Sequence, residues 1–301
     1  MEQFTPLKLP PALKPGDLLE VVAPSGALKD ELALEKGLEV WRSRGYKIKL
    51  AANYKTRYGY LAGNEDLRRS ALKLAWQNPL SKAIVCTRGG YGSTRLLEDW
   101  SWQTEENIKW LIGFSDITAL LWSLAKIGIA GIHGPVLTTL AKEPDWSIER
   151  LFDLVEGRSL QPLQGIGWGG GKTKGILLPA NFTVATHLLA TPLQLNFNNI
   201  VLAFEDVSEL PYSIDRMLTQ WRSSGILKKI KGLALGRFSR CDAPKDSFSW
   251  TVAEVWRDRT CDLNIPIVWD LPFGHDGANA ALRAGQMVEL DGASGILKFL
   301  Q

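Results

Sequence analysis

Ser115 is the residue whose type and setting most directly suggest chemistry. It follows the apolar run 110–114 and precedes a helical pattern that begins at Ile117. A serine at such a strand-to-helix turn is exposed, and the unpaired N–H groups of a helix start favour negative charge near its oxygen. The same position is also typical of an N-cap serine that has no catalytic part. Ser115 is therefore a candidate nucleophile, and its interpretation depends on its partners.

The three histidines of the chain are the candidate bases for such a serine, because a serine nucleophile needs a base within hydrogen-bond reach. His275 lies in a loop between Gly274 and Gly277, a setting that favours a functional role. His133 follows a predicted strand and could contact a substrate or serve the structure. His187 lies inside an apolar helical pattern, which favours packing. His275 is thus the preferred base.

Glu205 is the candidate carboxylate for orienting that base. It ends the most apolar run of the second half, residues 200–204, where a strand would hold it rigidly. Asp206 would project to the opposite face of the strand. A solvated acid at a strand end is the alternative interpretation of Glu205, and the residues alone leave both open.

A glycine-rich loop, Arg88-Gly89-Gly90-Tyr91-Gly92, follows one predicted strand and opens a helix. A dinucleotide fingerprint stands at such a place, but this spacing is not GxGxxG and no acidic residue follows on a next strand about 20 residues later. Closely spaced glycines also leave backbone N–H groups bare, which suits an oxyanion site. The planar fork of Arg88 suits bidentate binding of a substrate carboxylate.

The first half of the chain alternates short apolar runs with helical patterns, which predicts a largely parallel sheet covered by helices on both faces. In such sheets the ligand site lies at the carboxyl ends of the strands. The loops at Pro24, Arg88, Ser115 and His133 stand at those ends. Strands are predicted at 18–23, 46–50, 83–86, 110–114 and 129–132. Helices are predicted at 30–43 and 117–125. A further helix starts at Asn64, and another follows the glycine-rich loop and extends through Leu97.

The second half begins after an irregular stretch between about 138 and 174. Its glycine-rich part, 165–171, predicts a flexible junction, so we expect an N-terminal domain at 1–140, a linker at 141–174 and a smaller mixed α/β domain at 175–301. Lys172 and Thr173 resemble the end of a P-loop, but Ile166 stands where the first glycine of that motif is required. Strands are predicted at 175–178, 200–204, 232–235 and 265–269, helices at 182–189, 213–223 and 251–256, and a hairpin at 286–299.

Composition excludes several classes of function. The 35 basic and 32 acidic residues are scattered along the 301-residue chain, and the net charge is +3. No block of basic residues indicates binding to nucleic acid or to a membrane surface. The three cysteines are widely spaced, which argues against a metal pattern or a disulfide framework and suits a reducing compartment. No signal-peptide pattern begins the chain and no apolar run reaches about 20 residues. We expect a cytoplasmic protein whose 12 tryptophans mostly pack the core.

Seven segments, taken in order from about residue 10 to the end of the chain, resemble the LD-carboxypeptidase family of serine peptidases, which also contains the microcin C immunity peptidases. Each segment alone is modest, and their common order makes the match specific. They are Leu13-Lys14-Pro15-Gly16-Asp17 with Val22-Ala23-Pro24-Ser25-Gly26, Tyr60-Leu61-Ala62-Gly63, Arg88-Gly89-Gly90-Tyr91-Gly92, Gly113-Phe114-Ser115-Asp116-Ile117-Thr118, His133-Gly134-Pro135, Phe204-Glu205-Asp206-Val207 and Phe273-Gly274-His275.

The resemblance implies a Rossmann-like or flavodoxin-like N-terminal domain, a smaller C-terminal domain, a site between them and a homodimer. It implies release of the terminal D-alanine from a muropeptide tetrapeptide during peptidoglycan recycling in the cytoplasm, without a metal or organic cofactor. Ser115 would be the nucleophile, His275 the base and Glu205 its partner. The oxyanion hole would be formed by backbone amides of Asp116, Gly89 and Gly90. Apart from the resemblance, position makes Arg88 and His133 candidate substrate-binding residues, and Asn181 is a third candidate.

One departure from the family pattern concerns the turn expected after residue 178. The family usually has Gly-Gly-Asn there, whereas this chain has Pro179-Ala180-Asn181. Proline fixes φ and removes an amide donor, so the substrate preference could differ, and cleavage of a microcin-type peptide–nucleotide amide is one alternative.

Two other classes of protein stay open. An α/β-hydrolase shares the order Ser, acid, His but expects GxSxG, and Ile117 occupies the last glycine position. A two-lobed binder of small molecules without catalysis is the second.

Overall fold

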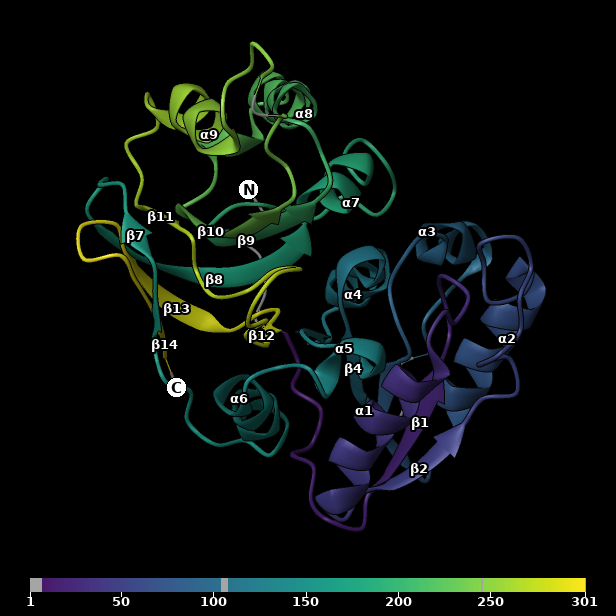
Figure 1. Cartoon of the computed structure of the whole chain (residues 1–301). Helices are drawn as coiled ribbons and strands as arrows, with labels where there is room; N and C mark the ends of the chain where they lie inside the picture. The colour runs from purple at the N-terminus through teal and green to yellow at the C-terminus, as the bar shows by residue number, and fades with distance from the viewer. Residues whose placement is uncertain (1–6, 104–107, 245, 301) are drawn as a thin grey trace. The chain divides into compact units, whose positions relative to one another are not determined.

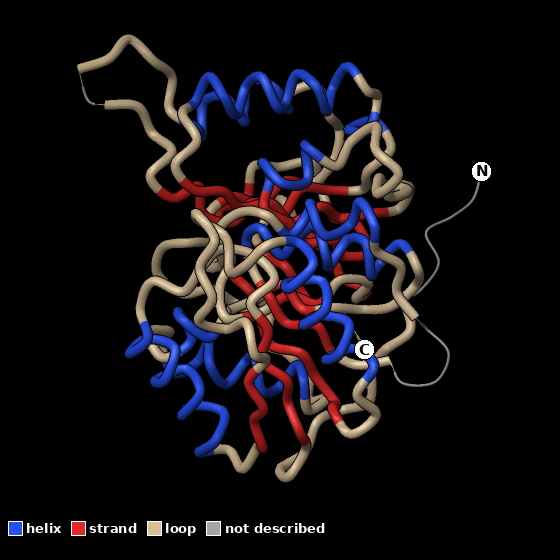
Figure 2. The backbone as a smooth tube through the Cα atoms, turned by 90° about the vertical axis from the view of Figure 1, so that its right-hand side faces the viewer, coloured by secondary structure: helices blue, strands red, loops and turns tan. Residues whose placement is uncertain are grey.

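The computed structural model describes residues 7–103, 108–244 and 246–300, and this part of the chain divides into two compact units (Figure 1). The N-terminal unit comprises 7–160 and 280–284, and the C-terminal unit comprises 161–279 and 285–300. Strands gather into one sheet in each unit, with helices packed against them (Figure 2). No helix in the described part of the chain combines the length and apolar character needed to cross a membrane.

The sheet of the N-terminal unit has six strands in the order β12-β5-β4-β3-β1-β2, parallel except for the edge strand β12. The parallel part has the flavodoxin-like order 2-1-3-4-5, so the predicted fold class of this unit is confirmed. The strand order reverses between β1 and β3, and ligand sites form at such a switch point. The strands are β1 (Leu18–Val22), β2 (Lys47–Leu50), β3 (Ser81–Cys86), β4 (Trp110–Gly113), β5 (Ile132–His133) and β12 (Leu282–Arg283).

The helices of this unit bury both faces of the sheet. One face carries Val22, Ile84 and Leu111 and packs against apolar residues of α2, α3 and α4. The alternate residues Val21 and Ile112 point to the other face and are buried as well. The helices are α1 (Glu31–Ser43), α2 (Glu65–Gln77), α3 (Ser93–Leu96), α4 (Thr118–Lys126), α5 (Leu137–Leu140) and α6 (Asp145–Val155), with 3₁₀ turns η1 (Leu97–Asp99) and η2 (Ser115–Ile117).

The sheet of the C-terminal unit has eight strands in the order β6-β14-β13-β8-β9-β10-β11-β7. The central strands β8 to β11 are parallel, and the others run antiparallel to their neighbours, which confirms a smaller, mixed α/β domain. The strands are β6 (Leu163–Gln164), β7 (Ile166–Gly167), β8 (Lys172–Asn181), β9 (Ile200–Val207), β10 (Gly232–Ser239), β11 (Ile267–Trp269), β13 (Met287–Asp291) and β14 (Ile296–Phe299).

An aromatic core joins the helices of this unit to its sheet. Phe182, Phe204, Trp221 and Trp256 are fully buried and contact one another with ring centroids 5.1 to 6.4 Å apart. Tryptophan thus serves packing here, as its frequency in the sequence suggests. The helices are α7 (Phe182–His187), α8 (Pro211–Ser223) and α9 (Val252–Thr260), with the 3₁₀ turn η3 (Ile226–Lys228), and α7, α8 and α9 lie on the same face of the sheet (Figure 1).

The structure differs from the predicted linker at 141–174. This segment contains α6, whose Leu151, Phe152 and Val155 are buried at helical spacing, and also β6, β7 and the start of β8. The chain passes between the units at 160/161 and again at 279/280 and 284/285. Gly165, Gly167 and Gly170 make close contacts that leave no room for a side chain, since a Cβ there would lie 2.5, 2.3 and 1.9 Å from backbone carbonyl oxygens.

Candidate functional site

Ser115 stands at the carboxyl end of β4, on a turn that forces an uncommon backbone conformation. Its φ of 60° lies in the left-handed region, which non-glycine residues rarely adopt. Such strain persists only where the surrounding structure holds it, and it gathers at functional sites. Gly113 permits the turn, because a Cβ there would lie 2.4 Å from the Ile117 side chain. The turn therefore presents a strained serine at the start of a helix, as a nucleophile elbow does.

Asp116 holds the Ser115 turn through hydrogen bonds to two neighbouring loops. Its carboxylate is buried and accepts hydrogen bonds from Ser25 Oγ at 2.6 Å and from the Ser93 amide at 2.8 Å. Ser93 Oγ in turn donates to the Asp116 carbonyl at 2.5 Å. These bonds join the loops after β1, β3 and β4 at the switch point of the sheet. The backbone N–H of Asp116 lies in the first turn of the helical segment, where it has no partner within the helix.

Gly89 lies directly against the Ser115 turn. A Cβ on Gly89 would be 2.9 Å from the Phe114 carbonyl oxygen, 3.0 Å from Ser115 Cβ and 3.4 Å from the Asp116 nitrogen. Gly90 follows with a φ of 122°, a conformation that favours glycine. The two predicted sources of oxyanion amides, the glycine pair and Asp116, are therefore neighbours beside Ser115.

If Ser115 is the nucleophile, replacing Gly89 by alanine is expected to lower kcat by at least about 100-fold, because the added methyl group must displace the turn that carries Ser115 and the candidate amide donor of Asp116. Gly128→Ala is a matched control, since Gly128 has open space around its Cβ position and a φ of 84°. Its expected effect is a loss of stability with kcat retained. Steady-state kinetics and thermal unfolding of both variants test this, and a Gly89→Ala enzyme of normal rate would contradict it.

Arg88 and His133 occupy positions within the same unit. Arg88 is half-buried and donates from Nη1 to the Ala27 carbonyl at 2.7 Å, which ties the loop after β3 to the loop after β1. His133 is buried and packs against the Phe114 ring, with centroids 4.8 Å apart. These contacts show structural roles for both side chains, and their contact with a substrate stays a prediction.

His275 and Glu205 form a hydrogen-bonded pair in the C-terminal unit. His275 Nδ1 lies 2.7 Å from Glu205 Oε2, although 70 residues separate them in the chain. Glu205 is fully buried within β9, so the alternative of a solvated acid at a strand end is wrong. The carboxylate fixes Nδ1 as the protonated nitrogen and leaves Nε2 as the nitrogen that would accept a proton.

The loop that carries His275 is held by backbone contacts to β10. Gly274 has a φ of 141°, and a Cβ there would lie 3.0 Å from the Arg237 carbonyl oxygen. Arg237 Nη1 donates to the carbonyls of Asp276 and Ala278, both at 2.8 Å. The Gly274 amide donates to Asn279 Oδ1 at 3.2 Å. The glycine and the arginine thus hold the loop that carries His275 against β10.

The charges around His275 favour its protonated form. Burial by itself lowers the pKa of His275, but the charge and hydrogen bond of Glu205 and the charge of Asp206 outweigh it and raise the pKa above 6.5. Arg240 opposes this from the end of β10. The result suits a general base that titrates near neutral pH.

Asn181 lies next to these carboxylates, at the end of β8. Its Oδ1 accepts from the Val184 amide at 3.1 Å and caps α7, and its Nδ2 donates to Asp206 Oδ1 at 2.9 Å and to Glu205 Oε1 at 3.3 Å. The structure thus gives Asn181 a role in holding carboxylates, and its predicted contact with substrate stays untested. Neither Asp206 nor the neighbouring Thr183 was assigned a role from the sequence. Two consecutive acids in an apolar strand were the available signal.

The sequence predicts a turn at Pro179, but the structure has a strand there. Pro179, Ala180 and Asn181 belong to β8 and pair in register with Ala203, Phe204 and Glu205 of the parallel strand β9. The Leu177 amide donates toward Gln286, and the pairing on that side ends there. The backbone of residue 179 faces the same side as that of Leu177, but it lies beyond the last paired residue. The N–H that proline lacks would therefore have had no partner in the β13 strand.

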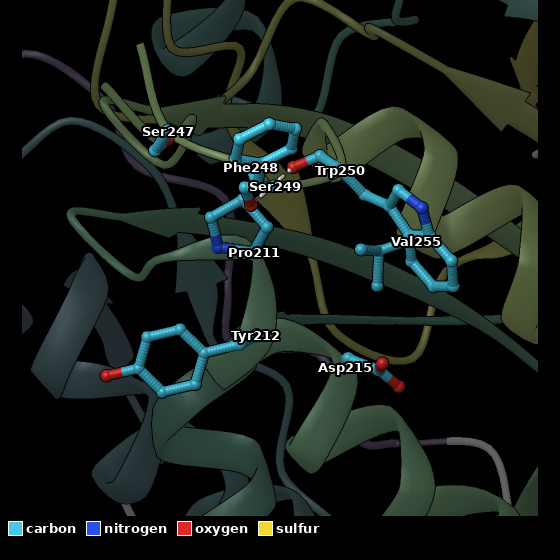
Figure 3. A pocket seen from close by; sticks show the side chains of 8 residues that line it. All are labelled: Pro211, Tyr212, Asp215, Ser247, Phe248, Ser249, Trp250 and Val255. Atoms are coloured by element: carbon cyan, nitrogen blue, oxygen red, sulfur yellow. Dashed lines mark hydrogen bonds between the residues drawn. The ribbon is translucent and has the colours of Figure 1, made fainter. Parts of the chain in front are cut away.

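The structure also holds a pocket of about 600 Å³ that contains no predicted site residue. Tyr212 and Asp215 of α8 face the segment Ser247–Trp250 across it (Figure 3). Trp250 and Val255 take the N′ and N4 positions of α9, whose N-cap is Thr251, which is the arrangement of a hydrophobic staple. Part of its lining therefore has a structural explanation. Within the described residues, no group of three or more His, Cys, Asp or Glu side chains is arranged to hold a metal ion.

Two family models match the chain, one in each half. The model described as the LD-carboxypeptidase N-terminal domain matches residues 19–134, and the model described as the LD-carboxypeptidase C-terminal domain matches residues 174–290.

Individual relatives match over nearly the whole chain. A candidate carboxypeptidase of Synechocystis sp. is 55% identical over 97% of this chain and 97% of its own length. The murein tetrapeptide carboxypeptidase of Pseudomonas aeruginosa is 30% identical over 90% of this chain and 92% of its own length. A solved structure of the microcin C7 self-immunity protein superposes with a TM-score of 0.87 and covers 96% of this chain and 97% of that one. At 19% identity, this last match shows a shared fold alone.

Proposed function

The chain belongs to the LD-carboxypeptidase family, and from this we propose that it is a serine carboxypeptidase that releases the terminal D-alanine of muropeptide tetrapeptides. Its catalytic groups would be Ser115, His275 and Glu205. The observation that carries this assignment is the His275–Glu205 pair at 2.7 Å, which is the base-and-orienter half of a triad. The strained turn of Ser115 supports the nucleophile half.

In the proposed mechanism, His275 Nε2 takes the proton of Ser115 Oγ as this oxygen attacks the scissile carbonyl. The reaction requires these two atoms to come within hydrogen-bond distance. Glu205 stabilises the imidazolium that forms, and the amides of Asp116 and the Gly89–Gly90 pair bind the oxyanion, each donor contributing about 3 kcal/mol. The C–N bond then breaks, and His275 gives the proton to the leaving amine of D-alanine. Water, activated by His275, hydrolyses the acyl-serine and restores the enzyme.

The choice of substrate rests on the relatives. One relative at 30% identity over most of the chain is named as a murein tetrapeptide carboxypeptidase, whereas the microcin immunity protein shares the fold at 19% identity. The muropeptide is therefore the favoured substrate, and a microcin-type peptide–nucleotide amide is the second candidate. A cytoplasmic location and a homodimer belong to the same proposal and rest on the family resemblance.

Incubation with a muropeptide tetrapeptide is expected to release D-alanine, which a D-amino acid oxidase assay measures. The diastereomer that ends in L-alanine is the matched control and is expected to react much more slowly. Binding of the tetrapeptide without turnover would favour a non-catalytic binder, and cleavage of simple esters alone would favour an ordinary hydrolase. Cleavage of an aminoacyl sulfamoyl nucleoside in place of the tetrapeptide would favour the microcin-type activity.

The pH dependence of kcat/KM is expected to rise with pH through an inflection above 6.5. The reason is that His275 must be neutral to act as a base, and its pKa is raised by Glu205 and Asp206 despite burial. Activity is therefore lost as the pH falls through this pKa. Initial rates at low substrate concentration between pH 5 and 9 test the expectation, and an acid limb well below pH 6 would exclude His275 as the base.

A further inference from the structure

Asp206 is a buried carboxylate to which the mechanism gives no direct part. Its Oδ2 accepts from the Thr183 amide at 2.9 Å and from Thr183 Oγ1 at 2.7 Å. Its Oδ1 accepts from Asn181 Nδ2 at 2.9 Å and from the Val207 amide at 2.8 Å. Burial and the charge of Glu205 raise the pKa of Asp206 to about 6, against these hydrogen bonds, which favour the ionised form. A buried acid with four donors is a built feature of the fold, since an isolated charge there would be costly.

Asn181 connects Asp206 to the predicted triad. Consecutive residues of a strand point to opposite faces, so Glu205 and Asp206 could not normally share one partner. Asn181 ends the neighbouring strand in register with Glu205, and its Nδ2 donates to both carboxylates. Its Oδ1 is held by the Val184 amide, so the amide group cannot flip without losing these bonds.

We propose that Asp206 is a positioning residue for the His275–Glu205 pair and acts through Asn181. Asp206 fixes the Asn181 amide, Asn181 holds Glu205 Oε1, and Glu205 Oε2 thereby stays directed at His275 Nδ1. The inference about geometry rests on contacts inside the C-terminal unit. Its catalytic consequence rests on the proposed function, in which His275 is the base.

The same arrangement predicts how neighbouring charges act on His275. Glu205 and Asp206 of β9 favour the imidazolium, and Arg240, which pairs with Asp276 at 3.2 Å, disfavours it. Arg240 is largely exposed, so salt screens its effect, whereas Asp206 is buried and keeps its effect at high ionic strength. Removing the charge of Asp206 should therefore lower the pKa of His275, whereas removing the charge of Arg240 should raise it.

A titration of the histidine ring signals by NMR tests the proposal without any substrate. Asp206→Asn is expected to lower the pKa of His275, and Arg240→Gln is expected to raise it, the second shift shrinking in 1 M salt. A folded Asp206→Asn variant with an unchanged His275 titration would overturn the proposal.

Kinetics supply a second readout. Asp206→Asn is expected to lower kcat about tenfold, as loss of a group that orients a functional histidine does, with KM unchanged and the acid limb of kcat/KM displaced downward. If Asp206→Asn does not fold, Thr183→Val weakens the same contact, and Thr183→Ser should restore the wild-type values because it keeps the hydroxyl. Equal kcat in Thr183→Val and wild type would count against the proposal. A wild-type protein without carboxypeptidase activity, but with the expected NMR shifts, would refute the proposed function and leave Asp206 as a positioning residue.

Discussion

Replacing Ser115 by alanine is expected to lower kcat on the tetrapeptide by about 10⁴- to 10⁶-fold while leaving the fold intact. Without Oγ no acyl-enzyme can form, and only substrate binding and the oxyanion donors remain to accelerate attack by water. Ser43→Ala is a suitable control, since Ser43 is an exposed residue at the end of α1 and its hydroxyl donates to the Val40 carbonyl of the same helix. Release of D-alanine under single-turnover conditions measures the loss.

Ser115→Gly separates catalysis from backbone strain. Both Ser115→Gly and Ser115→Ala should be inactive, but only glycine tolerates a φ of 60° without cost. A residue with a side chain at such a position costs about 1 kcal/mol or more. Glycine removes this strain, but it also increases the entropy of the unfolded chain, which offsets part of the gain in stability. Urea unfolding should therefore show Ser115→Gly to be the more stable of the two variants. Retained turnover in either variant would remove Ser115 from the proposed mechanism.

Replacing Glu205 by glutamine is expected to lower kcat by about 10⁴-fold with a small change in KM. The amide has nearly the shape of the carboxylate, but it cannot favour the imidazolium and can hold His275 in the wrong tautomer. The pKa of His275 should fall at the same time, because the charge and hydrogen bond of Glu205 are the main contributions that raise it. The acid limb of the residual activity would then move to lower pH.

Glu209→Gln is the matched control for Glu205→Gln. It makes the same chemical change two residues beyond the end of β9, and it is expected to leave the titration of His275 unchanged, because the acids that raise the pKa of His275 are Glu205 and Asp206. The comparison requires circular dichroism of both variants to show native folding. A Glu205→Gln enzyme within a factor of ten of the wild-type rate would mean that His275 is oriented by another group.

Local patterns in the sequence were sufficient for most of the elements. Asn64 accepts from the Leu67 amide as the predicted N-cap of α2, and the alternation of strands and helices before residue 133 yields the parallel sheet. These features depend on a few consecutive residues, whose hydrogen bonds and apolar spacing are readable without the rest of the chain. The position of Ser115 at a strand-to-helix turn is of the same kind.

Other features failed to follow from local patterns. Local patterns do not predict α6, whose apolar residues lie in a stretch that contains prolines and glycines. They predict a turn at Pro179, where the structure continues β8. A proline is acceptable at this position of β8 because pairing with the neighbouring strand β13 has already ended, and that is a property of the sheet.

The sequence by itself determined that a serine would stand at a strand-to-helix turn and that a glycine-rich loop could supply oxyanion amides. The family resemblance added His275 and Glu205 as the expected partners of this serine. Only the tertiary structure decided that Glu205 is buried and lies 2.7 Å from His275, that Gly89 touches the Ser115 turn, and that Asn181 joins Glu205 to Asp206. The physical reason is that these contacts link residues 24 to 70 positions apart in the chain. Their distances depend on strand register and on the close approach that glycine permits, and no local pattern encodes either of them.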